Sequence, residues 1–321
     1  MEPFGYIAAA DEKMALDEGQ RGTFIAGGTN MVDYMRLGVL RPATVIDISR
    51  LPLTAVEPAG DGVKIGALVR NSDLAYHPLI EKKYPVLAQA LLSGASPQIR
   101  NMATTGGNIL QRTRCPYFRD IHYAQCNKRN PGSGCAAIGG FNRSHAVLGT
   151  SDACIATNPS DMNVAMAALD ATVHVHGPKG ERDIAFVDFH TLPGQHPEIE
   201  SQLQPGDLIT HVLLPSISGK QTYLKVRDRA SFAFALASAA VVLDVQAGSI
   251  RSARVALGGV GTKPWRSKEA EAALVGQAPS PAVFAKAADA ALAGAKAQPS
   301  NAFKVELAKR TLVRALTEVA A

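Results

Sequence analysis

Short apolar runs alternate along the chain with segments in which apolar residues recur every three or four positions. FIAGG at 24–28 begins as a short buried strand, and 31–37 has the composition of a helix that Gly38 ends. TVIDIS at 44–49 and VKIGALV at 63–69 have the composition of strands. This strand–helix–strand opening predicts a fold that mixes α and β structure.

The same patterns continue to the C-terminus. Pro85 and Gly94 bound a predicted amphipathic helix, and a second helix runs from Ser160 or Asp161 to Leu169. Further strands are predicted at 172–177, 222–229, 234–245 and 252–260, and alanine-rich helices at 266–276, 281–295 and 302–319.

A polar segment rich in Pro and Gly, LPGQHPEIESQLQPGD, interrupts these patterns at 192–207. At 321 residues the chain is also longer than an ordinary domain of roughly 100–200 residues. We therefore expect an α+β protein with a first domain over 1–215 and a smaller second domain over 216–321.

Composition narrows the function classes. The chain is 46% hydrophobic and 19% charged, as folded proteins are, and Lys+Arg exceed Asp+Glu only as 33 to 28. Like charges form no block and aromatic residues make up 6%, so we expect no nucleic-acid binding. No run approaches the ~18 apolar residues of a membrane span, and the N-terminus lacks the pattern of a secretory signal. We therefore expect no membrane insertion and no export signal of the chain's own.

Two stretches, IAGGTNM at 25–31 and TTGGN at 104–108, each place a diglycine before a small polar residue. Diglycine lets the backbone approach a ligand closely, and free N–H groups at a helix start favour an anion. Neither stretch has the spacing of GxGxxG or of a P-loop. A plain tight turn is the alternative for either alone, but together they favour a pyrophosphate held from two sides. Nearby basic residues suit such an anion: Arg36, Arg100, Arg112 and Arg114.

Residues 111–155, here called the cysteine loop, show no sustained period and exceed the ~12–15 residues of a usual structureless loop. All four cysteines of the chain lie in it: Cys115, Cys126, Cys135 and Cys154. Their separations of ten, eight and eighteen residues leave three possibilities open, which are two disulfides, a structural zinc or an iron–sulfur cluster. The chemistry favours the cluster.

Taken together, AGGTN, TTGGN, NPSDMNVAMAALDA and the cysteine loop resemble the FAD-binding (medium) subunit of the molybdenum hydroxylase, or xanthine dehydrogenase, family. The chain looks most like the flavin subunits of bacterial aldehyde oxidoreductases of the periplasmic type. This resemblance implies a two-part FAD-binding domain of the vanillyl-alcohol-oxidase/PCMH type. A smaller α+β domain of the CO dehydrogenase flavoprotein type would follow it.

The resemblance also implies which residues hold FAD. The two glycine stretches would wrap the pyrophosphate, a Ser–Asp pair would lie by the cofactor, and a lysine would lie near the flavin. The implied set is Ala26, Gly27, Gly28, Thr29, Asn30, Met31, Thr104, Thr105, Gly106, Gly107, Asn108, Ser160, Asp161 and Lys225. A helix cap for Asp161 and an exposed charge for Lys225 are the alternatives.

A minority of these flavin subunits, including that of 4-hydroxybenzoyl-CoA reductase, carry a 4Fe-4S cluster in such a loop. By this resemblance Cys115, Cys126, Cys135 and Cys154 are its ligands.

The implied function is electron transfer. In the family, substrate is hydroxylated at a molybdenum cofactor in a large partner subunit, and 2Fe-2S centres in a small subunit pass electrons to FAD. From FAD the electrons leave for an external acceptor, and nothing in this sequence is assignable to NAD binding. The complex would lie in the cytoplasm, or in the periplasm after export with a signal-bearing partner. The rivals are a self-contained flavin reductase or dehydrogenase and a non-enzymatic module stapled by zinc or disulfides.

Overall fold

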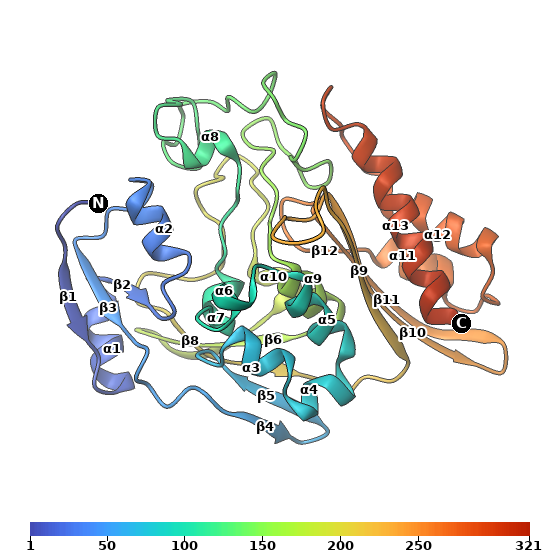
Figure 1. The fold of residues 1–321 in the computed structure, drawn as a ribbon, viewed down its shortest axis with the longest axis horizontal. Coiled ribbons are helices and arrows are strands. Elements are labelled where there is room, and N and C mark those ends of the chain that lie inside the picture. Colours follow the sequence, from blue (N-terminus) through green and yellow to red (C-terminus); the bar gives the residue numbers. More distant parts are fainter.

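The computed structural model describes residues 1–321 as three β-sheets with helices around them (Figure 1). The first sheet is parallel, in the order β1-β3-β2. Its strands are β1 (Gly5–Ala8), β2 (Thr23–Ile25) and β3 (Thr44–Asp47), with α1 (Glu12–Gly19) and α2 (Met31–Arg36) as the intervening helices. This unit begins the chain and carries the first glycine stretch between β2 and α2.

The second sheet has five strands in the order β4-β5-β8-β6-β7, and every neighbouring pair is antiparallel. Its strands are β4 (Val56–Ala59), β5 (Gly62–Gly66), β6 (Thr172–Gly177), β7 (Gly180–Ala185) and β8 (Leu208–Leu214). Because β8 lies between β5 and β6, a strand from the end of this region joins two strands that are more than a hundred residues apart.

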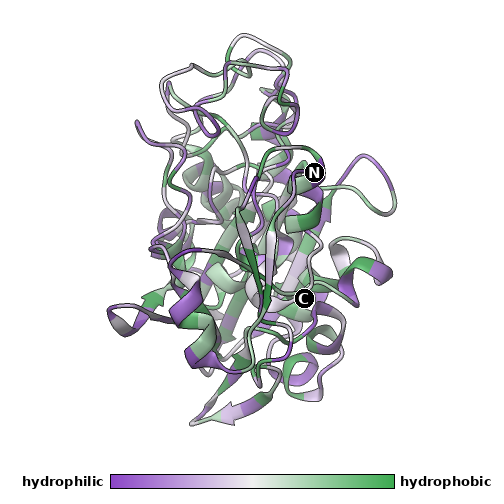
Figure 2. Cartoon of the chain, turned by 90° about the vertical axis from the view of Figure 1, so that its left-hand side faces the viewer, coloured by the Kyte–Doolittle hydropathy of each residue, from purple (hydrophilic) through white to green (hydrophobic).

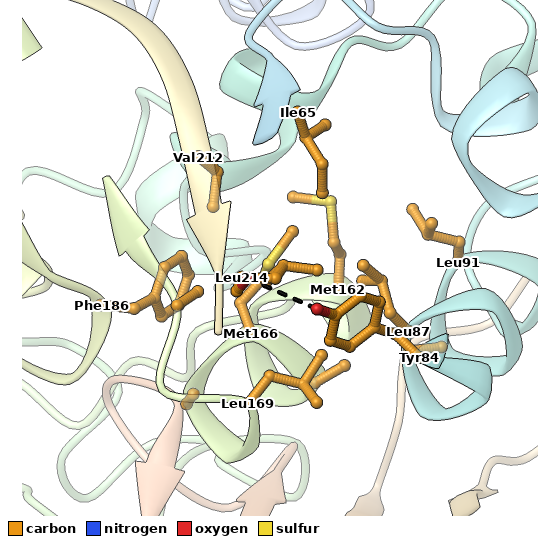
Figure 3. Close-up of a cluster of buried hydrophobic side chains, with 14 of the residues drawn as sticks. Ile65, Tyr84, Leu87, Leu91, Met162, Met166, Leu169, Phe186, Val212 and Leu214 are labelled. Carbon is orange, nitrogen blue, oxygen red and sulfur yellow. Dashed lines mark hydrogen bonds between the residues drawn. The ribbon is translucent and has the colours of Figure 1, made fainter. Parts of the chain in front are cut away.

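Short helices cover this sheet. They are α3 (Asn71–Ala75), α4 (Pro78–Lys83), α5 (Pro85–Ser93), α6 (Pro97–Arg100), α7 (Thr105–Ile109), α9 (Asp161–Ala168) and α10 (Phe186–Phe189). Every residue of α9 is buried, so this helix forms the centre of a core of 33 buried residues. Met162 and Met166 of α9 lie among Ile65, Val212 and Tyr84 (Figure 3).

The third sheet is antiparallel, in the order β12-β11-β10-β9. Its elements are β9 (Lys220–Val226), β10 (Ala237–Gln246), β11 (Ser249–Gly258) and β12 (Trp265–Arg266), followed by α11 (Lys268–Leu274), α12 (Pro281–Leu292) and α13 (Phe303–Ala320). Both faces of β10 are covered, since Ala240 and Val242 join the α9 core whereas Val241 and Leu243 join a second core against the C-terminal helices. Figure 1 shows the sheet between these two helical layers.

The cysteine loop lies at the top of Figure 1 and holds one short helix, α8 (Pro116–Arg119). Hydropathy colouring shows a mixture of hydrophilic and hydrophobic ribbon there (Figure 2). A small core of its own fills the loop, with Phe118 and three cysteines packed on Tyr34 of α2. The lack of periodicity in the sequence thus corresponds to irregular backbone around a local cluster.

The α+β fold is confirmed, and so are most predicted elements. The helix predicted between Pro85 and Gly94 is α5, the alternating TVHVHG is β6, and the three alanine-rich helices are α11–α13. Among the elements that the sequence patterns did not predict are β1, α1, β4, β7 and β8. The sequence of β8, LITHVLL, follows a Pro/Gly-rich segment that indicated only the approach to a boundary.

Candidate functional site

A cavity of about 790 Å³ opens among segments from distant parts of the chain. Its volume falls in the usual range of small-molecule sites, ~300–1,000 Å³. The lining includes six of the residues proposed above as ligands: Thr29, Asn30, Asn108, Cys115, Asp161 and Lys225. Both glycine stretches, the start of the cysteine loop, α9 and β9 therefore meet around one space.

The first glycine stretch turns tightly into α2. Gly28 has φ of +71°, a conformation that favours glycine. A Cβ on Gly27 would lie 1.8 Å from the Met102 carbonyl oxygen, just before the second stretch. Gly27 therefore lets the two glycine stretches pack together, in addition to any approach to a ligand.

Asn30 occupies the N-cap position of α2 without capping it. Its side chain instead donates to the Gly107 carbonyl (Nδ2–O 3.2 Å) and accepts from Arg114 (2.8 Å). Asn30 therefore joins both glycine stretches to the cysteine loop.

The second glycine stretch forms α7. The Thr104 hydroxyl caps this helix by accepting from the Gly107 N–H (3.3 Å), and the Thr105 hydroxyl donates to the Val69 carbonyl. A Cβ on Gly107 would meet only the Thr104 hydroxyl, at 3.0 Å. The hydroxyls of both threonines are thus used to shape the turn, and Gly107 is left beside open space.

Asp161 lies at the start of α9 between two donors from β9. Its Oδ1 accepts from the Tyr223 hydroxyl at 2.5 Å, and its Oδ2 accepts from Lys225 Nζ at 2.7 Å. The side chains of Asp161 and Lys225 are 5% and 3% exposed, and burial raises the pKa of Tyr223 well above its ordinary value. This buried network stays balanced in charge because the tyrosine remains neutral.

Both simpler alternatives for these residues are wrong. Ser160, not Asp161, caps α9 by accepting from the Asn163 N–H at 3.1 Å. Ser160 also donates to Asn108 Oδ1 at 2.7 Å. Lys225 is buried and is not a surface charge.

The cavity lining carries a positive excess that suits an anionic ligand. Its basic side chains are Arg100, Arg114, Arg119, Lys225 and Arg229, and its carboxylates are Asp33, Asp161 and Asp228. Each of the three carboxylates is paired: Asp33 with Arg114 and Arg119, Asp161 with Lys225, and Asp228 with Arg143. The Arg119 hydrogen bond holds the pKa of Asp33 below its usual range. Of the arginines noted in the sequence, Arg112 pairs with Glu200 instead.

Three residues of the lining bear a buried polar atom that has no partner in the protein. These atoms are Asn71 Oδ1, Arg114 Nε and His145 Nδ1. Buried polar atoms without partners are rare, so each is a candidate contact for a bound molecule or water.

The four cysteines are free thiols in one neighbourhood. Cys115, Cys126 and Cys154 are buried in one small core, and Cys135 packs on it and forms a β-bridge with Cys126. Burial raises the pKa of Cys115 to about 12. No group of three or more His, Cys, Asp or Glu side chains is arranged in this structure so that it could hold a metal ion. Cys115 also contacts His145, with Nε2–Sγ at 3.1 Å.

Sequence reasoning missed Tyr223, Asn71 and the segment 228–236, all of which border this site. Tyr223 had a usable signal, because it stands two residues before Lys225 in a strand and so shares its face. Asn71 had only a weak one, as a polar residue two positions after a predicted strand.

The chain matches two family descriptions. Residues 3–217 match the FAD binding domain in molybdopterin dehydrogenase, and residues 222–319 match the CO dehydrogenase flavoprotein C-terminal domain. No helix of the structure is both long and apolar enough to cross a membrane.

Two relatives illustrate the similarity. The chain is 52% identical to the aldehyde oxidoreductase FAD-binding subunit PaoB of Escherichia coli, over 93% of this chain and 91% of that one. It is 28% identical to the glyceraldehyde dehydrogenase medium chain of Sulfolobus acidocaldarius, over 85% and 82% of the two chains.

A solved structure agrees in fold. Carbon monoxide dehydrogenase from Hydrogenophaga pseudoflava superposes with a TM-score of 0.77 at 26% identity, covering 99% of this chain and 98% of that one. Together with the cavity between its glycine stretches, these similarities identify the chain as an FAD-binding subunit of the molybdenum hydroxylase family.

Proposed function

We propose that FAD lies in the cavity described above, with its pyrophosphate between the glycine stretches 26–31 and 104–108. The observation that carries this proposal is the convergence of both stretches with Asp161 and Lys225 on one cavity. The unpartnered atoms of Asn71 and Arg114 and the excess of basic side chains fit a large, polar, anionic ligand. Apart from the adjacent backbone, the only atom within 4 Å of a Cβ added at Gly107 is the Thr104 hydroxyl oxygen, so the backbone of Gly107 is otherwise uncrowded.

When bound, FAD supplies the redox chemistry. The residues of this chain bind it, orient it and set its electrostatic surroundings. Ser160 and Thr104 act indirectly, because their hydroxyls hold Asn108 and the turn of α7 in place. Lys225 contributes positive charge near the flavin, and Asp161 fixes the position of its amine.

We further propose that Cys115, Cys126, Cys135 and Cys154 bind a 4Fe-4S cluster. The gathering of three free thiols in one small core, with the thiol of Cys135 packed against it, supports this proposal. Thiolates buried this deeply need positive charge beside them, because burial, with the neighbouring Cys126 and Cys154, raises the pKa of Cys115 to about 12.

The role proposed for the chain is electron transfer within a complex of the aldehyde oxidoreductase type. A large subunit with the molybdenum cofactor and a small subunit with 2Fe-2S centres are the proposed partners. Electrons would reach FAD from the small subunit and leave for an external acceptor. Two of its relatives are an FAD-binding subunit and a medium chain, which supports a role as one subunit of several.

We also propose a division into domains 1–215 and 216–321. The third sheet and α11–α13 all follow residue 216, which supports this boundary. We propose the periplasm, after export with a signal-bearing partner, or the cytoplasm as the compartment of the complex.

The test is purification of the full chain, both alone and from cells that also express the two proposed partner subunits. The chain purified alone should show flavin absorption bands, a broad iron–sulfur shoulder and about four irons and four sulfides, with no iron from the partner's 2Fe-2S centres in the count. From the co-expressing cells we expect two co-purifying subunits. A colourless chain would contradict the FAD proposal, and a yellow chain without iron would contradict the cluster alone. Turnover of a small reductant by the isolated chain would favour the self-contained flavin reductase instead.

A further inference from the structure

Arg114 connects the cysteine loop with the first glycine stretch. It directly precedes Cys115, and its guanidinium donates to Asn30 Oδ1 at 2.8 Å and to Asp33 Oδ2 at 3.0 Å. Both acceptors belong to the start of α2. One side chain therefore joins the first cysteine of the loop to the turn that enters α2.

Asn30 extends this connection to the second glycine stretch. Its amide donates to the Gly107 carbonyl at 3.2 Å, and the next residue, Asn108, accepts from Ser160 of the α9 cap. A continuous chain of contacts thus runs from Cys115 through Arg114 to the segments on which we place the pyrophosphate.

Among the arginines of the loop, Arg114 alone contacts Asn30. Arg119 donates to Asp33 only, and Arg112 donates to Glu200. The Arg114 guanidinium also lies over the Tyr34 and Phe234 rings, with its carbon 5.7 and 5.3 Å from their centroids. These contacts hold it in one position across the cavity wall.

We propose that Arg114 couples the order of the cysteine loop to the affinity of the chain for FAD. When the cysteine loop is ordered and its four cysteines lie together, Arg114 holds Asn30, and hence both glycine stretches, in the conformation that binds FAD. When the loop becomes disordered, Arg114 no longer holds Asn30 in place. Coupling of this kind is reciprocal, so bound FAD also favours the ordered loop. The inference rests on the proposed placement of FAD.

A double-mutant cycle on the full chain tests the coupling. Cys126 does not line the cavity, so Cys126→Ser changes FAD affinity only through the loop. We expect Cys126→Ser and Arg114→Gln each to raise the Kd for FAD by about tenfold, within the usual 5- to 150-fold range of coupling. The double variant should bind no more weakly than either single variant.

Arg119→Gln is the matched control, because it removes a loop contact to α2 but leaves Asn30 in place. In that background Cys126→Ser should keep its full effect. An Arg114→Gln background in which Cys126→Ser also keeps its full effect would overturn the proposal, as would a Cys126→Ser variant with unchanged Kd.

Circular dichroism checks that the variants fold. Should Arg114→Gln not fold, Arg114→Lys serves instead, since a single ammonium cannot hold Asn30 and Asp33 as the guanidinium does. Iron content is measured on the same samples. A wild-type chain that binds FAD without iron contradicts the cluster but leaves the cycle valid, whereas a chain that does not bind FAD overturns both proposals.

Discussion

At the scale of single residues, the arrangement around Asp161 shows how little of this site is local. The carboxylate comes from α9 and its two donors come from β9, more than sixty residues later. Breaking a buried charged pair by removing one partner is costly, because it leaves the other charge without compensation. The neutral tyrosine is therefore the member of the network that can be altered most safely.

We expect Tyr223→Phe to raise the Kd for FAD by about tenfold. The change removes one of the two donors to Asp161, and hydrogen bonds to charged groups are worth roughly 1.5–3 kcal/mol. Fluorescence titration with FAD measures it. Tyr84→Phe is the control, because the Tyr84 hydroxyl donates to the Pro215 carbonyl away from the cavity. Equal affinities for the two variants would contradict the role given to Tyr223.

A second residue-scale prediction concerns the second glycine stretch. Gly107→Val should abolish FAD binding but preserve the fold, because its Cβ would meet only the Thr104 hydroxyl. The measurement is flavin released per chain, alongside the far-UV circular dichroism spectrum. Gly294→Val is the control, since no atom lies within 4 Å of its added Cβ. An undiminished flavin content of Gly107→Val would contradict the placement of the pyrophosphate at the second glycine stretch.

At the scale of elements, the C-terminal helix α13 helps to hold the cysteine loop. Lys304 of α13 is fully buried and donates to the carbonyls of Ser144, His145 and Gly259. Burial lowers the pKa of Lys304 to about 7. No carboxylate pairs with this amine, so its partners are the backbone oxygens of two irregular segments. The cysteine loop is thus supported by the C-terminal element of the chain.

Lys304→Met should lower the free energy of unfolding by about 2–4 kcal/mol, because three buried carbonyls lose their donor. Urea denaturation followed by circular dichroism measures the change. The exposed Lys286 of α12 supplies the control, and Lys286→Met should shift the value by no more than about 0.5 kcal/mol. If both variants were equally stable, α13 would not anchor the loop in this way.

At the scale of the whole molecule, stability depends on groups buried where the sheets and helices meet. The ring of His190 is buried, with Nε2 3.0 Å from the Ile109 carbonyl oxygen and 3.4 Å from Nδ2 of Asn163 in α9, and with Nδ1 without a partner. Burial lowers the pKa of His190 from 6.5 to about 4. The fold therefore holds this ring neutral in mildly acidic solution.

The sign of the pH dependence follows. Above pH 6.5 the ring is neutral in both states, whereas between pH 6.5 and about 4 only the unfolded chain takes up the proton. The proton uptake of His190 alone should therefore lower the free energy of unfolding by about 3 kcal/mol across this window. Chemical denaturation at several pH values measures the slope. His190→Gln should make the slope shallower without removing it, because burial also lowers the pKa of His145 to about 4. His122→Gln, at a side chain 91% exposed, should leave the slope unchanged.

Much of the fold was predictable from the sequence because its signals are local. The periodicity of α5, α12 and α13 and the alternation of β6 each lie within one segment. β8 was missed because its place in the sheet depends on two strands far away in the chain. The candidate FAD residues were likewise proposed from short motifs, but no motif predicts that Tyr223 reaches Asp161.

By itself the sequence determined most of the elements, the diglycine turns, the crowding of four cysteines into one irregular loop and the family that these motifs resemble. Only the tertiary structure decided three features. The Asn30 side chain accepts a hydrogen bond from Arg114 instead of capping its own helix, the backbone of Met102 packs closely against Gly27, and Lys225 is buried. The physical reason is that helix and strand patterns come from neighbouring residues, whereas burial and side-chain partners depend on which distant surfaces pack together.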